Sequence, residues 1–219
     1  PDLTYLNLGH NELVNLQITN CDNLEMLWIR ENHLSDLDFN SFPNLETLNV
    51  MYNLFTTLDV SSLTHLTTFY ASGNYLATSL NIKNGSTENN LEFDYIPNLH
   101  FICADDSQID SLLSLASQYQ YADCVINSYC SFTSGGVTYD VGGETRYDFD
   151  NNGCSNTDLI YSSLRLSVTD GVNSGGFIAN ASGNYMITVP AGNYTIAPIL
   201  ENPTYFITSP ASIIVDFPI

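Results

Sequence analysis

The strongest constraint on the fold is a repeat of 21 residues in the first part of the chain. A leucine recurs at this interval, and an asparagine recurs at the same interval eight residues further on. The repeating positions are Leu3, Leu24, Leu45, Leu66 and Asn11, Asn32, Asn53, Asn74. A unit this short cannot bury an apolar face alone, whereas stacked units can. The repeat therefore predicts a solenoid.

Each unit reads L-x-x-L-x-L-x-x-N-x-L, followed by a second apolar run and a polar turn. Over residues 3–82 this pattern resembles the leucine-rich repeat family. The resemblance implies that each unit contributes one strand to a parallel sheet lining a concave face, and that an inward-turning asparagine bonds to neighbouring backbone. Because the unit leaves no room for a full helix on the opposite side, we expect extended structure there, as in residues 55–60.

The repeat loses its spacing after Ile82. We expect an inserted loop over Lys83–Tyr95 and a last strand of the solenoid from Leu99. Apolar residues at helical spacing then fill Ser107–Tyr121, and two aspartates precede them. This segment predicts a C-terminal helical cap over the solenoid core. The chain begins in register with a repeat, so further repeats are expected upstream.

Composition changes near Ser131, where leucine becomes rarer and Gly, Thr, Tyr and Val become more frequent. We therefore expect two domains, residues 1–130 and 131–219, with a junction at Ser131–Gly136. Seven short β-rich runs separated by Gly, Pro and Asn indicate a β-sandwich in the second domain. These runs are residues 137–147, 164–168, 175–179, 185–189, 194–200, 205–208 and 212–217.

The segment Ser182–Ile196 reads S-G-N-Y-M-I-T-V-P-A-G-N-Y-T-I. Its alternation predicts a hairpin around Pro190-Ala191-Gly192. The segment resembles the collagen-adhesin B-type repeat and the related immunoglobulin-like and transthyretin-like sandwiches, over most of residues 137–219. The resemblance implies a rigid spacer in a surface protein. Some relatives carry a Lys–Asn isopeptide bond, but the one lysine here, Lys83, lies in the first domain, so that bond is excluded.

The strongest chemical motif begins at Asp148. Oxygen-bearing side chains at positions 1, 3 and 5, glycine at 6 and a backbone carbonyl at 7 are what calcium loops use. The motif resembles the EF-hand-like loops of B-type repeats, except that Leu159 replaces the usual glutamate at position 12. We expect a structural calcium ion and a loop that closes differently; the alternative is an Asx-rich turn without metal. The candidate ligands are Asp148, Asp150, Asn152, Cys154 and Asp158.

None of the five cysteines belongs to a C-x-x-C pair, so a zinc site is not expected. Four cysteines lie near the domain junction, which is typical of disulfides in an exported protein. We favour the pairs Cys103–Cys124 and Cys130–Cys154, although spacing alone leaves the connectivity open. Cys21 falls at a turn of the repeat and is expected to be a free thiol.

The charge balance excludes some partners. The chain has 24 acidic residues against four Lys and Arg, a formal net charge of −20. Nucleic acid and anionic membranes both need a cationic surface, so neither is expected as a partner. The sequence also lacks an apolar run of the roughly 18 residues that membrane insertion requires.

The outward-facing strand positions carry the residue types that dominate binding interfaces. The candidate partner-binding residues are Tyr5, Met26, Trp28, Arg30, Tyr52 and Tyr70. Aromatic residues also favour strands for structural reasons alone. The favoured hypothesis is a secreted or surface-anchored bacterial protein, resembling internalin-like adhesins and exported Bacteroidetes repeat proteins, that binds a protein partner.

Catalytic residues are not expected, because the sequence has no nucleophile elbow, phosphate loop or set of paired carboxylates in a defined pocket. The alternative hypothesis is a carbohydrate-binding accessory region of a larger secreted enzyme. Exposed Trp and Tyr rings can stack on sugars, and transthyretin-like modules accompany enzymes.

Overall fold

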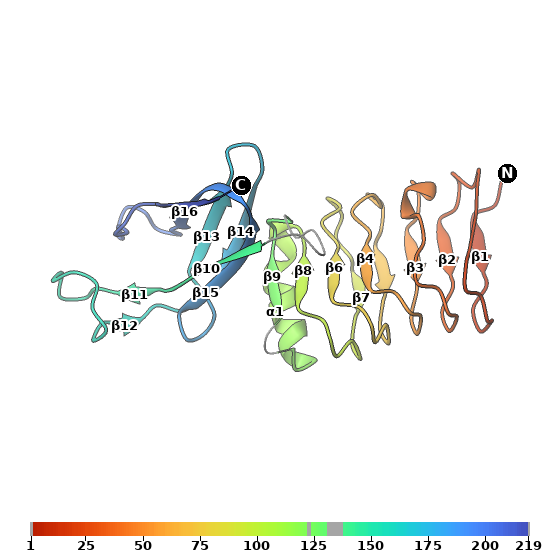
Figure 1. Ribbon diagram of the computed structural model, residues 1–219, viewed down its shortest axis with the longest axis horizontal. Helices are drawn as coiled ribbons and strands as arrows, with labels where there is room; N and C mark the ends of the chain where they lie inside the picture. The colour runs from red at the N-terminus through yellow and green to blue at the C-terminus, as the bar shows by residue number, and fades with distance from the viewer. Residues whose placement is uncertain (1, 122–123, 131–137, 219) are drawn as a thin grey trace. The chain divides into compact units, whose positions relative to one another are not determined.

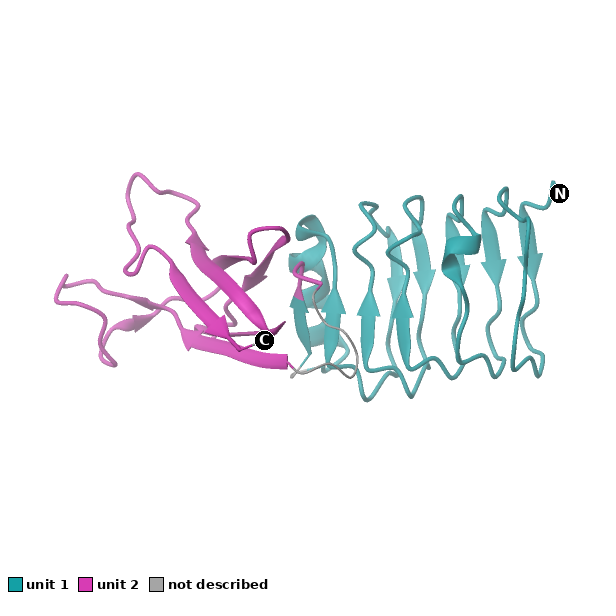
Figure 2. Ribbon diagram, turned by 45° about the horizontal axis from the view of Figure 1, so that its top comes forward, with its two compact units in different colours: residues 1–126 teal, residues 127–219 magenta. Residues whose placement is uncertain are grey.

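The computed structural model describes residues 2–121, 124–130 and 138–218. The chain divides into two compact units, residues 1–126 and 127–219 (Figure 2). This boundary lies before the one expected at Ser131, because Ser128 and Tyr129 already pack within the second unit. The Ser128 N–H donates to the Gly176 carbonyl at 2.9 Å, and Tyr129 belongs to the hydrophobic core of the second unit. The junction expected at Ser131–Gly136 lies outside the described residues.

The first unit contains two parallel sheets (Figure 1). The first sheet joins, in order, β1 (Tyr5–Asn7), β2 (Met26–Trp28), β3 (Thr47–Asn49), β5 (Thr68–Tyr70) and β7 (Asn90–Glu92). The second joins β4 (Thr57–Asp59), β6 (Ser79–Asn81), β8 (Phe101–Cys103) and β9 (Val125–Asn127). The second sheet confirms the extended structure expected opposite the first sheet. In the second repeat a 3₁₀ helix, η1 (Phe39–Ser41), follows the corresponding segment.

The register of the sheets explains the repeat. In the first sheet Leu27 lies opposite Leu6 and Leu48, and in the second Leu58 lies opposite Leu80. The middle residue of each inner strand is almost fully buried, so the apolar columns of the sequence become the core between the two sheets. The first repeat is more exposed, because no described repeat covers Leu3, Leu6 or Leu8 on the other side.

Two expectations about the end of the repeat array are wrong. Lys83–Tyr95 is not an inserted loop, because it contains β7, which pairs with β5 and places Leu91 opposite Phe69. The strand after Leu99 is β8, which belongs to the second sheet and places Ile102 opposite Leu80. The fifth repeat is therefore present, and it begins 22 residues after the fourth instead of 21, because Leu91 lies opposite Phe69.

Glu88 interrupts the leucine pattern at the start of the fifth repeat, so the pattern does not reveal this repeat. It stands at the position that leucine holds in the earlier repeats, and it is buried. Its carboxylate accepts hydrogen bonds from Asn84 Nδ2 at 2.8 Å and from Gln108 Nε2 at 2.5 Å. A buried carboxylate with two donors is tolerated at a core position where an unpaired one would not be.

The asparagine ladder implied by the repeat is confirmed. Asn32 Nδ2 donates to the carbonyls of Ile29 and Leu8, each at 3.0 Å, and its Oδ1 accepts from the Leu13 N–H at 3.0 Å. Asn53 repeats all three contacts, and Asn74 repeats the two donated ones. Each side chain thus pairs backbone groups of two successive repeats that no strand partner reaches.

The fifth repeat has Ile96 where the others have asparagine, and Tyr121 replaces the missing amide. The Tyr121 hydroxyl donates to the Phe93 carbonyl at 2.9 Å and accepts from the Ile96 N–H at 2.9 Å. The Tyr121 ring also stacks on Phe93, with centroids 6.1 Å apart. Tyr121 therefore ends the ladder with a single side chain.

The helical segment expected after the last strand is confirmed. It consists of a 3₁₀ turn, η2 (Asp106–Gln108), and α1 (Ile109–Gln118). α1 buries Ile109, Leu112 and Ala116. Asp105 does not cap the helix with its side chain, and instead accepts from the Gly85 N–H at 2.9 Å. Among the described residues no helix is long and apolar enough to cross a bilayer.

The second unit is antiparallel. One sheet has the order β14 (Ser174–Ile178), β13 (Arg165–Thr169), β16 (Gly192–Ile199) and β17 (Ile213–Phe217). β10 (Thr138–Glu144) pairs with β15 (Asn184–Pro190), and β11 (Arg146–Tyr147) pairs with β12 (Leu159–Ile160). The hydrophobic core of this unit consists of Tyr129, Leu166, Val168, Phe177, Ile187, Val189, Tyr194 and Ile196.

The hairpin expected around Pro190-Ala191-Gly192 does not form. β15 pairs with β10, whereas β16 pairs with β13 and β17, so the tight connection crosses from one sheet to the other. Ile187 on β15 and Ile196 on β16 consequently face one core from opposite sides. Residues 205–208, expected as a strand, form no strand, whereas β12 was not expected.

Neither expected disulfide forms. Cys103 and Cys130 are disulfide-bonded, but Cys124 and Cys154, each needed for one expected pair, are free, as is Cys21. The Val125 N–H donates to the His100 carbonyl at 2.8 Å, which sets Cys124 beside His100. Cys124 is thus three residues, or about 10 Å along the strand, from Cys103, beyond the reach of a disulfide.

Candidate functional site

The outer side of the first sheet, here called the sheet face, presents two rows of side chains. Strand register defines the rows, since successive strands place equivalent residues side by side. One row is Tyr5, Met26, Thr47, Thr68, Asn90, and the other is Asn7, Trp28, Asn49, Tyr70, Glu92. Four of the six candidate partner-binding residues lie on the sheet face.

Three of these four come together. Met26 lies directly beside Tyr5, and Trp28 follows two residues later on the same side of β2. Trp28 is half-buried, and its Nε1 is buried without a hydrogen-bond partner among the described residues. Tyr70 lies two strands from Trp28, about 10 Å away, with Asn49 between them.

Arg30 and Tyr52 lie on the turns that follow β2 and β3, outside the two rows. Arg30 Nη2 contacts Glu31 Oε1 at 2.5 Å, and Glu31 Oε2 lies 2.7 Å from His10 Nδ1. The hydrogen bond from Arg30 holds the pKa of Glu31 below its ordinary value. The charge of Arg30 is therefore already paired.

Tyr52 packs on the next repeat. Gly73 has a φ of +76°, and a methyl group built on it would overlap the Tyr52 ring. Glycine is needed there both for the left-handed backbone and for the close approach of the ring. Tyr52 keeps 37% of its surface exposed and extends the apolar area beyond the sheet.

An acidic groove runs beside the Tyr5–Met26 row. It encloses about 340 Å³. Its lining residues are Asp2, Thr4, Asn23, Glu25, Asn44, Glu46 and His65. Glu25 and Glu46 are equivalent residues of successive repeats, so the repeat itself generates a row of negative charge.

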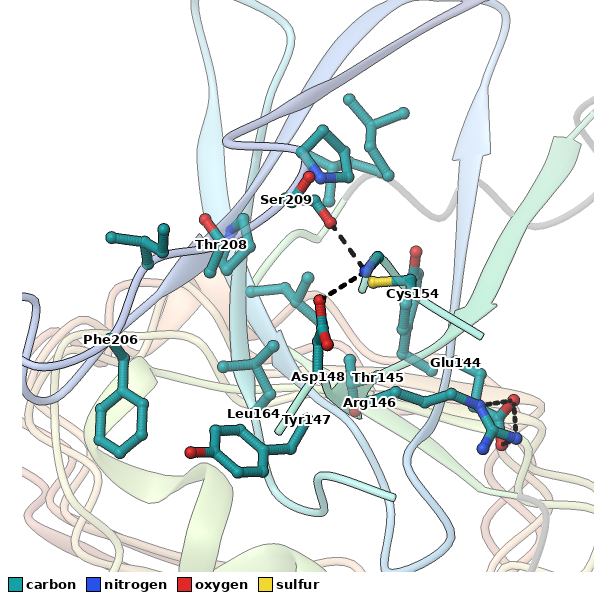
Figure 3. Close-up of a pocket in the computed structure, with 18 of the residues that line it drawn as sticks. Glu144, Thr145, Arg146, Tyr147, Asp148, Cys154, Leu164, Phe206, Thr208 and Ser209 are labelled. Carbon is teal, nitrogen blue, oxygen red and sulfur yellow. Dashed lines mark hydrogen bonds and ion pairs between the residues drawn. The ribbon is translucent and has the colours of Figure 1, made fainter. Parts of the chain in front are cut away.

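In the second unit, Arg146 organises the expected calcium loop (Figure 3). Its Nε and Nη2 contact the Glu144 carboxylate at 2.8–3.0 Å. Its Nη1 donates to the carbonyls of Asn156 and Asp158, at 3.1 and 2.7 Å. One guanidinium thus pairs a carboxylate and fastens the end of the loop.

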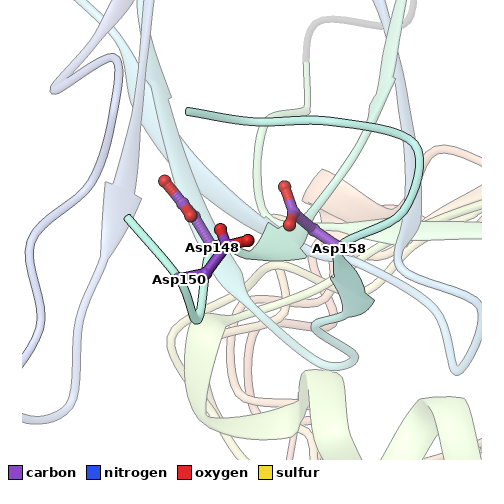
Figure 4. A group of neighbouring side chains, drawn as sticks. All are labelled: Asp148, Asp150 and Asp158. Carbon is purple, nitrogen blue, oxygen red and sulfur yellow. The ribbon is translucent and has the colours of Figure 1, made fainter. Parts of the chain in front are cut away.

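Three carboxylates converge in this loop (Figure 4). β11 pairs with β12 so that Tyr147 lies opposite Leu159, and the residues next to this pair are Asp148 and Asp158. One oxygen each from Asp148, Asp150 and Asp158 lies within 4.8 Å of the others. Oxygens bound to one calcium ion at 2.3–2.6 Å can be about this far apart, so the three carboxylates fit a hard cation.

Backbone N–H groups already orient these carboxylates. Asn152 N–H donates to Asp148 at 3.1 Å, Gly153 N–H to Asp148 at 2.9 Å, and Ser155 N–H to Asp158 at 2.6 Å. Each carboxylate retains further lone pairs that a cation could use. Three carboxylates fall short of the six to eight oxygen ligands that calcium takes, so carbonyls or water would complete the shell.

The other candidate ligands differ in position. Asn152 donates through Nδ2 to Asp150 at 2.7 Å, which leaves its amide oxygen as the group able to ligate. The Cys154 thiol donates to the Ser209 carbonyl at 3.9 Å and is outside the carboxylate group. Leu159 is 61% exposed on β12, and Asp158 takes the closing position that the missing glutamate leaves.

A cavity beside this loop was not foreseen from the sequence. It encloses about 620 Å³, and its lining residues fall within five stretches of the chain, 144–154, 164–166, 185, 196–198 and 205–213, of which not every residue faces the cavity. Five separated segments meet there, so no local pattern could have revealed it. The acidic motif at Asp148 marks one edge only.

No family model matches the chain, and no curated protein matches it. Among solved structures, similarity is found to the functional domain of InlJ from Listeria monocytogenes, which includes a cysteine ladder. The identity is 28% over 47% of this chain, which spans 25% of that one, with a TM-score of 0.31. A likeness this weak carries no argument about function. The architecture itself, mainly β with parallel sheets and one repeat per 21 residues, is consistent with a leucine-rich-repeat-like fold.

Proposed function

We propose that this chain is a secreted or surface-anchored bacterial binding protein without enzymatic activity. It would recognise a protein partner through the sheet face. The observation that carries the proposal is the cluster of Tyr5, Met26 and Trp28 on one side of adjacent strands. Tyrosine and tryptophan supply much contact area for little conformational entropy, and they dominate measured interface energies.

The state of Trp28 supports this choice. Its ring is half-buried, but its Nε1 has no protein partner among the described residues. Because the buried Nε1 is out of a partner's reach, the part of Trp28 available for binding is the exposed portion of its ring, which offers contact area.

The acidic residues around the apolar cluster indicate what kind of partner would bind there. The acidic groove with Glu25 and Glu46 borders the apolar cluster, and Glu92 lies in the Trp28 row. Arg30 cannot balance them, because its charge is paired with Glu31. A complementary partner would therefore present an apolar centre and a basic rim.

The second unit would act as a spacer of the immunoglobulin-like or transthyretin-like sandwich class. A calcium ion at Asp148, Asp150 and Asp158 would cancel the repulsion of three adjacent carboxylates and hold the β11–β12 arm together. This role is structural.

The test compares the full chain with its Trp28→Ala and Tyr70→Ala variants, each immobilised and exposed to surface extracts. A protein retained by the wild type and lost with Trp28→Ala supports the proposal. Tyr75→Ala is the matched control, because Tyr75 is half exposed in the same unit but lies outside the sheet face. Circular dichroism must show all variants folded.

Equal retention of the protein by wild type, Trp28→Ala and Tyr70→Ala would move the binding site away from the sheet face. The second candidate, a carbohydrate-binding accessory region of a larger secreted enzyme, rests on the same exposed rings. A glycan array probed with wild type and Trp28→Ala separates the two. Glycan binding that depends on Trp28 would favour the second candidate.

A further inference from the structure

The cavity in the second unit has the size of a small-molecule site, and Figure 3 shows residues that line it. Its volume of about 620 Å³ lies within the usual range of ligand pockets, roughly 300–1,000 Å³. Its floor includes Leu166 and Ile196, which belong to the hydrophobic core of this unit. The cavity therefore reaches the core from the surface.

Aromatic rings form much of the wall. Tyr147 and Phe206 meet edge to face, with centroids 6.2 Å apart, and Tyr185 also lines the cavity. At the rim Tyr205 is 84% exposed and Ile207 is 93% exposed. Exposed apolar residues gathered around a concavity, rather than scattered singly, mark an interaction site.

The charged groups of the cavity decide which ligand it fits. Arg146 has its donors occupied by Glu144 and by two loop carbonyls, so it offers no free positive charge. Glu144 is neutralised by that pair. Asp148 accepts hydrogen bonds from the uncharged N–H groups of Asn152 and Gly153, and among the described residues it makes no ion pair within 4.0 Å.

We propose that this cavity, when the neighbouring loop holds no calcium, binds an aromatic amine, a molecule with a flat apolar body and an ammonium group; calcium and the amine would compete for Asp148. The body would fill the space between Tyr147, Phe206 and the Leu166 floor, and the ammonium group would pair with Asp148. The aromatic walls add a cation–π attraction. An anion would meet Asp148 with no free cation to compensate, and a neutral apolar molecule would desolvate Asp148 without a partner.

The test is calorimetric titration of the full chain with phenethylamine at neutral pH without added metal. One molecule is expected to bind with a Kd of about 1 mM or below, as the size of the ligand allows. Hydrocinnamate has the same ring and a similar chain length but an anionic end, and it is expected to bind at least about tenfold more weakly. No binding of phenethylamine at about 10 mM, or equal binding of the two, overturns the proposal.

Two variants locate the site. Asp148→Asn should weaken phenethylamine binding about tenfold, whereas Asp216→Asn, which changes an exposed carboxylate of the same unit outside the cavity lining, should leave it unchanged. Thr208→Trp should fill the cavity and abolish binding without altering charge. Thermal melts establish that each variant is folded. Equal affinity in Asp148→Asn and Asp216→Asn, or wild-type affinity in Thr208→Trp, rejects the cavity as the site.

Discussion

Tyr121 ends the asparagine ladder, so its hydroxyl should matter more to the first unit than its ring. Tyr121→Phe removes the oxygen and keeps the ring stacked on Phe93. The Phe93 carbonyl and the Ile96 N–H then lose their shared partner. Both residues are fully buried, so water cannot readily replace the hydroxyl.

The expected cost follows from these two backbone groups. Leaving one buried polar group unpaired costs about 1–3 kcal/mol, so Tyr121→Phe should lower the free energy of unfolding by about 2–4 kcal/mol. With a urea slope of about 2 kcal/mol/M, the midpoint should fall by about 1–2 M. This exceeds the effect of most surface substitutions.

Trp28 makes the measurement specific, because it is the only tryptophan of the chain and lies in the first unit. Urea unfolding followed by its fluorescence reports that unit alone. Tyr119→Phe is the control, since Tyr119 also packs on Phe93, at 5.2 Å, and its loss of a hydroxyl leaves both ladder bonds intact. If the Tyr121→Phe and Tyr119→Phe midpoints agree, the ladder-ending role of Tyr121 is refuted.

The same contact predicts a response to alkali. Burial raises the pKa of the Tyr121 hydroxyl above its ordinary value. The folded state thus favours the protonated form, and this stabilisation is fully present below about pH 10 and lost as pH rises further. In Tyr121→Phe this part of the alkaline destabilisation should disappear.

Three further predictions concern other groups. Calcium at about ten times its Kd should raise the melting temperature of the second unit by about 5–10 °C. Asp158→Asn should abolish this rise. An unchanged melting temperature in the wild type would contradict the assignment of the loop as a calcium site. Thiol titration at pH 8 should detect the exposed Cys154 in the native chain. Cys21 and Cys124 should react only after the chain is unfolded without reductant. Cys21 is buried, and burial raises the pKa of Cys124 to about 12. Hydrogen bonds from the Asn173 side chain and backbone hold the pKa of Asp170 below its ordinary value, so its stabilisation is present above about pH 4 and lost as pH falls; Asp170→Asn should remove that acid-dependent part of the unfolding free energy.

Periodic features were readable from the sequence because they recur. The 21-residue spacing predicted the parallel strands, and the asparagine column predicted a ladder that the hydrogen bonds of Asn32 and Asn53 confirm. The acidic motif predicted three carboxylates that the structure does bring together. In each case the signal lies in residues close in sequence or repeated at a fixed interval.

The errors share a different cause. Glu88 replaces a core leucine, and only its bonds to Asn84 and Gln108 show how a carboxylate is accommodated there. The strands flanking Pro190-Ala191-Gly192 have a hairpin pattern, but pairing with β10 and β13 separates them. Alternation tells which side of a strand is apolar, and it does not tell which neighbour the edge will pair with.

The sequence by itself determined the solenoid, its apolar columns, the acidic surface and the residue types of the sheet face and of the acidic loop at Asp148. These follow from composition and period, which act through short-range geometry. Tertiary structure alone decided which strands pair, which cysteines are bonded, how Tyr121 ends the ladder and where the cavity lies. Those outcomes depend on distances between segments far apart in the chain, because hydrogen bonding and burial are satisfied by whichever groups the fold brings into contact.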